Sequence, residues 1–410
     1  MKRIIIIGGG VAGITAAIKA KNANNEVTVL EKNKTCLKKL LITGNGHCNY
    51  FNDDYNYKHY YSNNLELVSK IITSESKKLL TDFYQSIGLV PRIKNGYYYP
   101  YSNQAYAVLN ALIKEADIKG VKIINEVDVT NIKIADKFIV ETNKENYIAD
   151  KVIVATGSKA YPKTGSTGDG YRFAKILNHT VNNVYPALVQ VVTDDKYLHE
   201  LDGVRNDTKV TLLVDSKSIK EEVGELQFTN YGLSGICIYN LTLAINKYLE
   251  EGKEVKIKLN LLHGLNINNE SDLDNYLSKQ NKLLNKRTLV ELLEEILNYK
   301  IVNALFKKYK INNDIIYDEI SSDSKLELLN ALVNYEVKVV GTKDFNNAQV
   351  CSGGLLLTEL NTDTFESKLV KGLYFVGELI DITGECGGYN ISFAVLSGLK
   401  AGINVGGIND

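Results

Sequence analysis

The sequence has few cysteines, no net charge and no long apolar run. Its 410 residues include 5 cysteines, none spaced as C-x-x-C, so a disulfide framework and a structural zinc site are both disfavoured. This cysteine usage is typical of the reducing cytoplasm. The 48 basic and 48 acidic side chains cancel, which argues against a nucleic-acid binder that works by bulk positive charge alone. No segment has the roughly 18 consecutive apolar residues of a membrane helix, so we expect no membrane-spanning segment. From the cysteine spacing we also expect no metal site.

The composition is that of a folded protein with more than one domain. Hydrophobic residues make up 44% and charged residues 23%, which excludes a disordered chain, a coiled coil and a collagen-like fibre. A single core rarely grows beyond about 250–300 residues. We therefore expect two or three domains.

The first thirty residues predict a strand, a glycine-rich turn, a helix and a second strand. Ile4–Ile7 is a β-branched run typical of a strand buried on both faces, and Val27–Leu30 is a second such run. The segment Ile14–Lys21 between them has a helical pattern. The turn has the spacing Gly8-x-Gly10-x-x-Gly13, which in this context indicates a dinucleotide-binding unit.

Each part of this unit has a physical role. Gly8 permits the tight turn, Gly10 lets the backbone approach a pyrophosphate, and Gly13 lets the helix pack on the sheet. The helix N-terminus offers free N–H groups to phosphate. Glu31, 18 residues after Gly13, can accept hydrogen bonds from the adenosine ribose and would repel the 2′-phosphate of NADP. A turn without a ligand is the alternative, but three glycines would leave apolar volume unfilled.

The rest of the chain predicts further strands of the same domain at both ends. Residues 122–148 alternate in three short runs that predict a β-meander, and Lys151–Thr156 and Leu373–Val376 predict buried strands. Residues 391–399 predict a closing helix. Residues 187–261 hold strand-like runs that suggest a small antiparallel barrel, whereas residues 276–310 follow a helical period.

Three later segments distinguish FAD from NAD. Ala155-Thr156-Gly157 follows a strand and matches the "ATG" segment of two-dinucleotide-fold flavoproteins. Residues 372–381 match their second FAD segment, where an acidic side chain meets the ribityl chain. Residues 384–390 open the last helix, whose N-terminus would point at the pyrimidine edge of the flavin.

These motifs identify a resemblance to the BaiN/RdsA family of FAD-dependent oxidoreductases. It covers nearly the whole chain and rests on GGGVAG (8–13), KKLLITGNGHCN (38–49), ATGSKAYPKTGSTGDGY (155–171), GELQFTNYGLSG (224–235) and GLYFVGELIDITGECGGYN (372–390). Two departures are His47, where the family usually has arginine, and Ser158, where it has glycine.

The resemblance implies an α/β fold in which a glutathione-reductase-like FAD domain is split in sequence. The FAD domain would comprise residues 1–188 and 342–410, an inserted β-barrel residues 189–262 with about 334–341, and a helical domain residues 263–333. FAD would be bound non-covalently. The residues expected at FAD are Gly8, Gly10, Val11, Ala12, Gly13, Glu31, Lys32, Lys39, Gly44, Asn45, Cys48, Asn49, Val127, Ala155, Thr156, Gly157, Gly377, Glu378, Asp381, Gly387, Gly388, Tyr389, Asn390 and Ile391.

Some of these assignments have plain alternatives. Lys39 could be a solvated lysine rather than a phosphate ligand, and Asn45 and Asn49 could serve only the turn. The glycine-rich segment 165–170 does not follow a strand end directly, so there is no second Rossmann domain for NAD(P)H. Either NAD(P)H binds transiently over the flavin or another electron donor is used.

Reduction of an activated C=C bond needs a hydride and a proton, and three residues are candidates for the proton or for substrate contact: Cys48, His47 and Tyr389. Cys48 could donate only if its pKa stays near its ordinary value; a buried, unreactive thiol is the alternative, and the same applies to Cys386. The tyrosine-rich segment 97–101 could form a stacking wall for a planar substrate or simply pack.

The candidate functions remain open at this point. They are a C=C reductase for a steroid-like enone or for uridine in ribosomal RNA, a small-amine oxidase using O₂, and a non-enzymatic FAD-binding protein. Residues 276–310 carry eight basic and three acidic side chains, which suits either a phosphate-contacting face or a solvated one. The partner would thus be a small molecule or ribosomal RNA, and no stable protein partner is indicated.

Overall fold

The computed structural model describes residues 1–284 and 287–407. The chain forms two compact units, which are described separately. The first comprises Met1–Pro186 and the chain from Ala348 onward, and the second comprises Ala187–Asn347. No helix among the described residues is long and apolar enough to cross a membrane.

A five-stranded parallel sheet forms the centre of the first unit, with strand order β20-β11-β1-β2-β7. Its strands are β1 (Lys2–Ile7), β2 (Asn25–Glu31), β7 (Lys122–Asn125), β11 (Lys151–Val154) and β20 (Leu373–Phe375). Ile4 and Ile6 are fully buried and Ile5 and Ile7 nearly so, because layers cover both faces of the sheet. The first and last segments of the chain thus contribute to one sheet.

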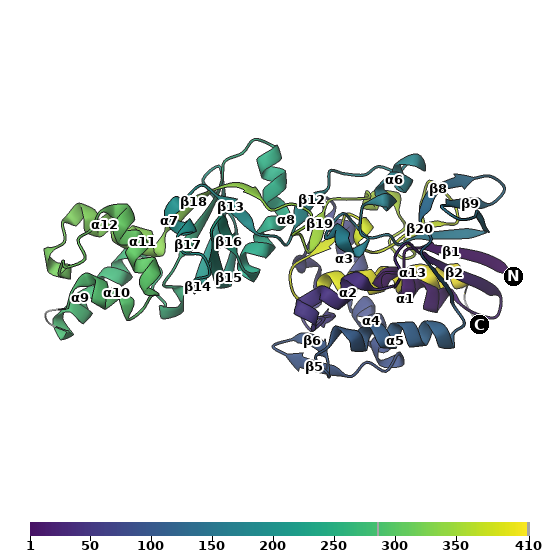
Figure 1. Cartoon of the computed structure of the whole chain (residues 1–410), viewed down its shortest axis with the longest axis horizontal. Coiled ribbons are helices and arrows are strands. Elements are labelled where there is room, and N and C mark those ends of the chain that lie inside the picture. The colour runs from purple at the N-terminus through teal and green to yellow at the C-terminus, as the bar shows by residue number, and fades with distance from the viewer. Residues whose placement is uncertain (285–286, 408–410) are drawn as a thin grey trace. The chain divides into compact units, whose positions relative to one another are not determined.

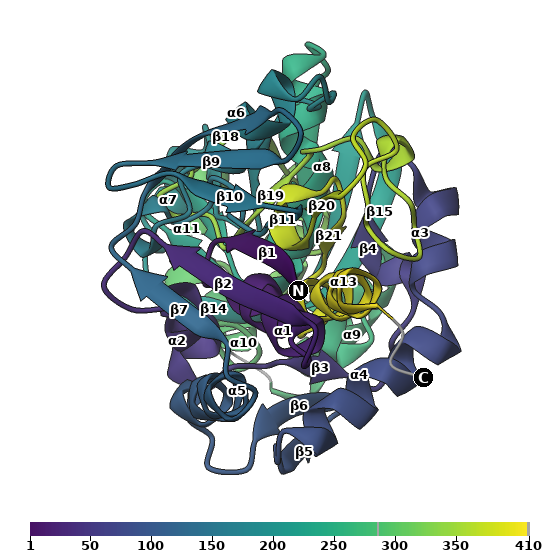
Figure 2. The same ribbon diagram turned by 90° about the vertical axis from the view of Figure 1, so that its right-hand side faces the viewer.

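Helices α1 (Val11–Ala20), α5 (Ala105–Ile118) and α13 (Tyr389–Gly406) pack together on one side of this sheet (Figure 2). Two glycines let α13 approach α1 closely. A Cβ on Gly398 would lie 2.4 Å from the Ala12 oxygen, and one on Gly402 would lie 2.5 Å from the Ala16 oxygen. Side chains at these positions would push the C-terminal helix away from the N-terminal one.

The β-meander beside the sheet consists of β8 (Val129–Ile134), β9 (Phe138–Thr142) and β10 (Tyr147–Ala149). The prediction that the run beginning at Lys122 belongs to this meander is wrong. Its first residues form β7, which pairs in parallel with β2. A polar alternating strand can sit at the edge of a parallel sheet because that position is only half covered, and local pattern alone does not distinguish the two cases.

The first unit has further short elements around the sheet. They are α2 (Lys38–Ile42), η1 (Thr43–Gly46), β3 (Phe51–Asn52), η2 (Tyr57–His59), β4 (Tyr60–Tyr61), α3 (Leu65–Ile71), α4 (Ser74–Ser86), β5 (Pro91–Lys94), β6 (Tyr97–Pro100), η3 (Pro162–Thr164), α6 (Asp169–Ile176), β12 (Tyr185–Ala187), β19 (Val350–Ser352), η6 (Leu357–Glu359), η7 (Gly377–Leu379) and β21 (Thr383–Gly384).

A closed six-stranded barrel and a group of helices make up the second unit (Figure 1). Around the barrel the strands are β13 (Val191–Thr193), β16 (Gly232–Ser234), β15 (Lys217–Thr229), β14 (Arg205–Val214), β17 (Val255–Asn260) and β18 (Tyr335–Thr342). The helices are α7 (Lys196–His199), α8 (Ile236–Glu250), η4 (His263–Leu265), α9 (Glu270–Leu283), α10 (Leu289–Glu294), α11 (Tyr299–Tyr309), η5 (Tyr317–Glu319) and α12 (Ser322–Val333). The helical period predicted over residues 276–310 is confirmed by α9, α10 and α11.

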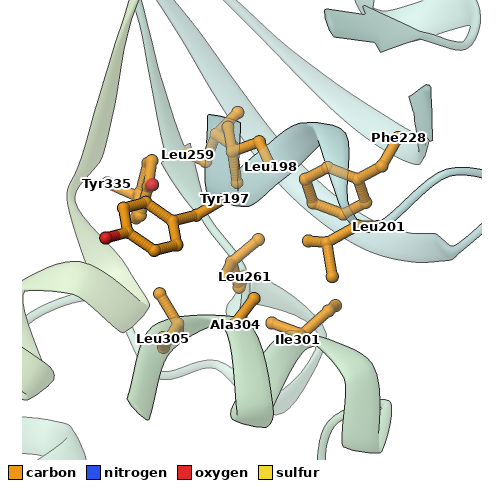
Figure 3. Close-up of a pocket in the computed structure, with 10 residues that line it drawn as sticks. All are labelled: Tyr197, Leu198, Leu201, Phe228, Leu259, Leu261, Ile301, Ala304, Leu305 and Tyr335. Carbon is orange, nitrogen blue, oxygen red and sulfur yellow. The ribbon is translucent and has the colours of Figure 1, made fainter. Parts of the chain in front are cut away.

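The barrel and the helices of this unit share one apolar core. Phe228 and Leu261 from the barrel side meet Ile301 and Leu305 of α11 around a small cavity (Figure 3). The cavity leaves about 10 Å³ free to a water-sized molecule, which is the size of a packing defect rather than of a ligand site. It is therefore too small to be a binding site.

Candidate functional site

The carboxyl ends of four parallel strands bring the predicted dinucleotide residues together. In-register pairing aligns Ile7 of β1 with Leu30 of β2 and with Val154 of β11, and Val154 with Phe375 of β20. Because parallel strands all end at the same edge, the turns that follow them lie side by side. These turns carry Gly8, Glu31, Ala155 and Gly377.

The glycine-rich turn fits a bound dinucleotide. Gly8 has φ +107°, and a Cβ there would lie 2.5 Å from the Ala155 oxygen, while a Cβ on Gly13 would lie 2.0 Å from the Gly8 oxygen. Gly10 differs, because a Cβ there would meet no atom within 4 Å. Helix α1 has no side-chain cap and no acidic residue in its first turn. Its N–H groups therefore border open space, as an anion site at a helix N-terminus requires.

Glu31 is nearly buried and holds the turn in place. Its Oε2 accepts the Gly9 N–H at 2.8 Å, and its Oε1 accepts both the backbone and the side-chain N–H of Asn33 at 2.7 Å. Three donors leave room for about one more hydrogen bond. The contact between Glu31 and the ribose therefore stays a prediction, and the carboxylate could accept about one hydrogen bond from it. Val127 donates its N–H to the Glu31 carbonyl at 3.0 Å, which leaves only the Val127 carbonyl for an adenine.

The loop from Lys39 to Asn49 reaches the beginning of α13. Gly44, Asn45 and Cys48 have φ of +54°, +53° and +56°, a left-handed geometry that the backbone adopts to fold back on itself. With its amide nitrogen facing the two acceptors, Asn49 donates to the carbonyls of Phe51 at 3.0 Å and Tyr98 at 3.2 Å. Asn49 thus anchors the loop, which agrees with its alternative role in the turn.

Lys39 forms an ion pair with Glu378, with 2.6 Å between Nζ and Oε2. The other Glu378 oxygen accepts from the Ser158 hydroxyl at 2.7 Å and from the Cys351 N–H at 3.1 Å. Ser158, one of the two departures from the family pattern, therefore has a specific partner. Lys39 as a phosphate ligand stays a prediction, and in this structure it is neither exposed nor unpaired.

Two buried oxygens at this edge have no protein partner among the described residues. One is Oδ1 of Asp381, a residue that is 1% exposed, and the other is the Thr156 hydroxyl. The second Asp381 oxygen accepts the side-chain amides of Asn63 at 2.9 Å and Asn182 at 3.1 Å. A buried oxygen without a partner is costly, so both atoms fit contacts with hydroxyl groups of a bound ribityl chain.

The turn before α13 is held by Asn390. Its side chain donates to the Gly384 carbonyl at 2.7 Å and accepts the Gly384 N–H at 2.8 Å. Gly387 and Gly388 have φ of +137° and +92°, and a Cβ on Gly388 would lie 2.8 Å from the Phe51 nitrogen. Helix α13 also begins without a side-chain cap or an acidic residue in its first turn. Ile391 is in that first turn.

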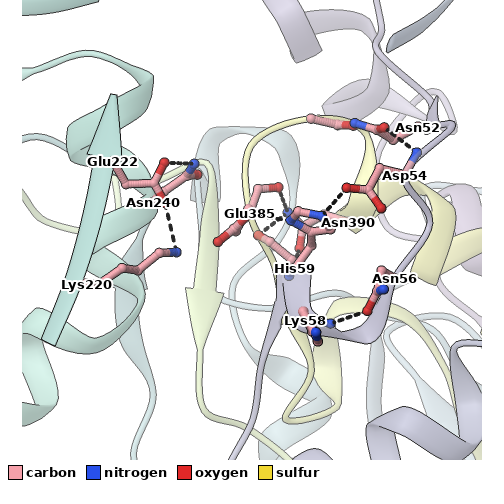
Figure 4. Close-up of polar contacts among 12 residues, drawn as sticks. Asn52, Asp54, Asn56, Lys58, His59, Lys220, Glu222, Asn240, Glu385 and Asn390 are labelled. Atoms are coloured by element: carbon pink, nitrogen blue, oxygen red, sulfur yellow. Dashed lines mark hydrogen bonds and ion pairs between the residues drawn. The ribbon is translucent and has the colours of Figure 1, made fainter. Parts of the chain in front are cut away.

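A polar cluster that sequence reasoning missed lies beside this turn (Figure 4). His59 Nδ1 is 2.8 Å from Glu385 Oε2, and His59 Nε2 is 2.9 Å from Asp54 Oδ2. The imidazole stacks on the Tyr389 ring, with 4.7 Å between ring centres and 16° between planes. The hydrogen bond that His59 donates to Glu385, followed by the one it donates to Asp54, raises the pKa of His59 above its usual value. Glu385 lies within one of the motifs named in the sequence analysis, but His59 lies in a tyrosine-rich segment that matches no motif.

The three residues predicted to supply the proton or to contact the substrate differ in access. Cys48 is fully buried, and burial raises its pKa to about 12, so the condition attached to its role as an acid does not hold. Tyr389 is 4% exposed, and burial raises its pKa far above the usual value. His47 is exposed, and its Nδ1 lies 2.8 Å from the Asn103 carbonyl.

Other predicted residues lie farther along the same edge. Lys32 pairs with Asp169 at 2.7 Å, which ties the end of β2 to the start of α6. The segment 165–170 comprises the loop before α6 and the first two residues of that helix, and it does not follow a strand end. In the tyrosine-rich segment, Tyr98 packs edge-on against Phe51, and Tyr101 is 71% exposed. Tyr97 lies against Gly387, next to the turn before α13.

The basic segment of the helical part is less positive than its sequence suggests. Lys307 pairs with Glu200, Lys308 with Asp195, and Arg287 with Glu295. Lys286 lies outside the described residues. Across residues 263–333 the chain has nine basic and eleven acidic side chains, a net charge of −2. No group of histidine, cysteine and carboxylate side chains in the described chain could hold a metal ion.

Comparisons with known proteins place the chain in a family. Residues 2–404 match the model of the HI0933-like protein Rossmann domain. A 3-dehydro-bile acid delta(4,6)-reductase from Clostridium scindens is 36% identical over 408 residues, covering 98% of both chains. A ribosomal RNA dihydrouridine synthase from Haemophilus influenzae is 27% identical over 408 residues, again covering 98% of both.

A solved structure is similar to this one in fold. It is a 3-ketosteroid-delta4-(5alpha)-dehydrogenase from Rhodococcus jostii in complex with 4-androstene-3,17-dione, with a TM-score of 0.50, 12% identity and coverage of 99% of this chain and 97% of that chain. Neither the family nor these relatives favour a small-amine oxidase. Since the family model covers nearly all of the sequence, the chain belongs to the HI0933-like Rossmann family, the BaiN/RdsA type, and is a flavin-dependent oxidoreductase.

Proposed function

We propose that this chain is an FAD-dependent reductase that saturates an activated C=C bond in a small, steroid-like enone. The observation that carries the proposal is its 36% identity, over 98% of both chains, to a bile-acid enone reductase. The RNA-modifying relative is less similar, at 27%. Residues 263–333 carry a net charge of −2, which gives no support to RNA binding by bulk positive charge.

FAD rather than NAD is the proposed cofactor, held by a domain split between the two ends of the chain, with the barrel and helices inserted. The uncapped N-terminus of α1 would receive the pyrophosphate beside Gly10. Asp381 and Thr156 have buried oxygens without partners that suit hydroxyl groups. The start of α13 offers N–H groups and has no acidic residue in its first turn, which favours an electron-rich flavin edge.

The bound flavin would supply the hydride, and the chain's own residues would supply orientation and a proton. Asn390 fixes the turn 384–388, and Asn49 fixes the end of the loop 39–49 to the carbonyls of Phe51 and Tyr98. At the same edge of the sheet, Lys39 and Glu378 neutralise each other in an ion pair. NAD(P)H is proposed as a transient electron donor.

A half-reaction experiment tests the proposal. The purified protein is loaded with FAD, reduced without oxygen by NADH, NADPH or dithionite, and mixed with a 3-keto-Δ4 steroid. We expect the flavin absorbance to return at a rate that depends on steroid concentration, with the saturated ketone as product. A colourless protein that binds no FAD would refute the cofactor assignment. A reduced protein that is reoxidised only by uridine-containing ribosomal RNA would refute the substrate class.

A further inference from the structure

The cluster of Asp54, His59 and Glu385 is built by tertiary structure rather than by a local motif. Antiparallel pairing of β4 with β21 aligns Tyr61 with Thr383, and the Glu385 N–H donates to the His59 carbonyl at 2.9 Å. Residues that are 326 positions apart therefore share both a backbone and a side-chain hydrogen bond. The side chain of His59 is 28% exposed, and that of Glu385 is 15% exposed.

The geometry determines the protonation state of His59. Each ring nitrogen faces a carboxylate oxygen within 2.9 Å, and an ionised carboxylate can only accept a hydrogen bond. Both nitrogens must then carry hydrogen, so the ring is an imidazolium. A neutral imidazole would leave one lone pair facing a negative oxygen. The raised pKa of His59 agrees with this argument.

The groups around the ring come from three different segments. Asp54 follows β3, Glu385 lies in the turn before α13, and Tyr389 contributes the stacked ring from α13 itself. These are the titratable groups in direct contact with the imidazole in the part of the chain that the structure describes. Two carboxylates therefore face one ring, and their negative charge favours its protonated form.

Asp54 connects the cluster to water. Its side chain is 70% exposed, whereas Glu385 is mostly covered. A proton lost from His59 can therefore be replaced through the Asp54 side. On its other side the ring borders the turn 384–388, which is also contacted by Asn52 through the Gly387 carbonyl at 3.1 Å.

The other acids near this turn are less suitable. Cys48 is fully buried and its pKa is raised to about 12, and Lys39 is engaged by Glu378. The Tyr389 phenol is buried beneath the His59 ring. Both N–H groups of His59 donate to carboxylates, but the Nε2 hydrogen faces the exposed Asp54, so a movement of the Asp54 side chain would free that N–H for a substrate.

On the basis of the function proposed above, we propose that His59 is the catalytic proton donor of the enone reduction and that Asp54 relays protons to it from water. The hydride reaches the β-carbon of the enone, and the imidazolium N–H bond breaks as a C–H bond forms at the α-carbon. The electron pair of that N–H bond stays on the ring nitrogen. The neutral ring then takes a proton from water through Asp54, which restores the imidazolium.

The protonation state can be tested without turnover. In protein labelled with ¹⁵N-histidine, the ring signals of His59, assigned by their loss in His59→Gln, should show two protonated nitrogens up to a higher pH than free histidine does. The Asp54→Asn variant should lose the proton at a lower pH than the wild type. A His59 ring that loses its second proton at or below the pH at which free histidine does would overturn the proposal.

The chemical role is tested in the reoxidation half-reaction. We expect His59→Gln to bind FAD and to be reduced as the wild type is, but to be reoxidised by the enone about 10²- to 10⁴-fold more slowly, the usual contribution of a positioned acid. Asp54→Asn should retain the first turnover and slow later ones. Lys58→Gln, a matched exposed neighbour, should behave as the wild type.

The outcomes separate the two proposals. If the wild type is not reoxidised by the enone, the proposed function fails. The role of His59 is refuted if the enone reoxidises the wild type and also reoxidises a folded, FAD-loaded His59→Gln variant equally fast. Should His59→Gln not fold, the Asp54→Asn variant decides, and multiple-turnover rates and a pH profile equal to those of the wild type would refute the relay.

Discussion

Gly10 provides the sharpest test of where the cofactor binds, because the protein itself has space for a side chain there. Gly10 has φ −76° and ψ −176°, an extended geometry that alanine adopts without strain, and a Cβ would meet no atom within 4 Å. As an N-cap change, Gly10→Ala should cost the FAD-free protein at most about 1 kcal/mol. In contrast, Gly13→Ala would force a Cβ to within 2.0 Å of the Gly8 oxygen.

The effect on binding should be larger. If the pyrophosphate lies against Gly10, the added methyl occupies that contact, and overpacking of one methyl costs about 1–3 kcal/mol. This corresponds to an FAD affinity lower by about 5- to 150-fold. At FAD concentrations of 100 times the wild-type Kd, where binding contributes about 2.7 kcal/mol to stability, the variant should lose a large part of that gain.

The assay combines FAD titration by fluorescence with urea unfolding, each with and without FAD. We expect nearly equal stability without FAD for the wild type and Gly10→Ala, and a much smaller FAD-dependent increase in the variant. Gly13→Ala should be destabilised even without FAD. Equal FAD affinity in the wild type and Gly10→Ala would refute the placement of the pyrophosphate at α1.

Four further predictions follow from the same structure. Glu378→Gln should lower the unfolding free energy of the FAD-free protein by about 1.5–3 kcal/mol, because Lys39 would lose its ionised partner. Urea unfolding measures the loss, and an unchanged unfolding midpoint would contradict the prediction. Iodoacetamide at pH 8 should label Cys386 before the four buried cysteines, as mass spectrometry would show, and early labelling of Cys48 would contradict its burial. Folding raises the pKa of His59 above 6.5, so the stabilising contribution of the protonated ring is full below pH 6.5 and is lost as the pH rises through the folded-state pKa. The difference in melting temperature between the wild type and His59→Gln should therefore shrink between pH 6 and 9. A difference that does not depend on pH would indicate that His59 stabilises the protein by packing alone. Exchanging Lys279, Lys282 and Lys300 for glutamate should leave steroid reduction unchanged, and a large loss would indicate an anionic substrate held by the helical part.

Much of the dinucleotide site follows from local sequence. Ile4–Ile7, the glycine spacing and Glu31 specify a strand, a turn and a helix within thirty residues, since each requirement is met by neighbours in the chain. The same holds for the turn at Ala155 and for the start of α13. The sequence did not distinguish the edge strand β7 from a meander strand, because both alternate and only pairing with β2 separates them.

Sequence by itself determined that this chain binds a dinucleotide, because the glycine turns and the segments after strands are local patterns with a physical cause. Only tertiary structure decided which side chains those turns bring together. The buried oxygen of Asp381, the ion pair between Lys39 and Glu378 and the imidazolium of His59 all depend on pairs that are far apart in sequence. Their contacts are made with neighbours that the folded sheet supplies, and no periodicity in the chain encodes those neighbours.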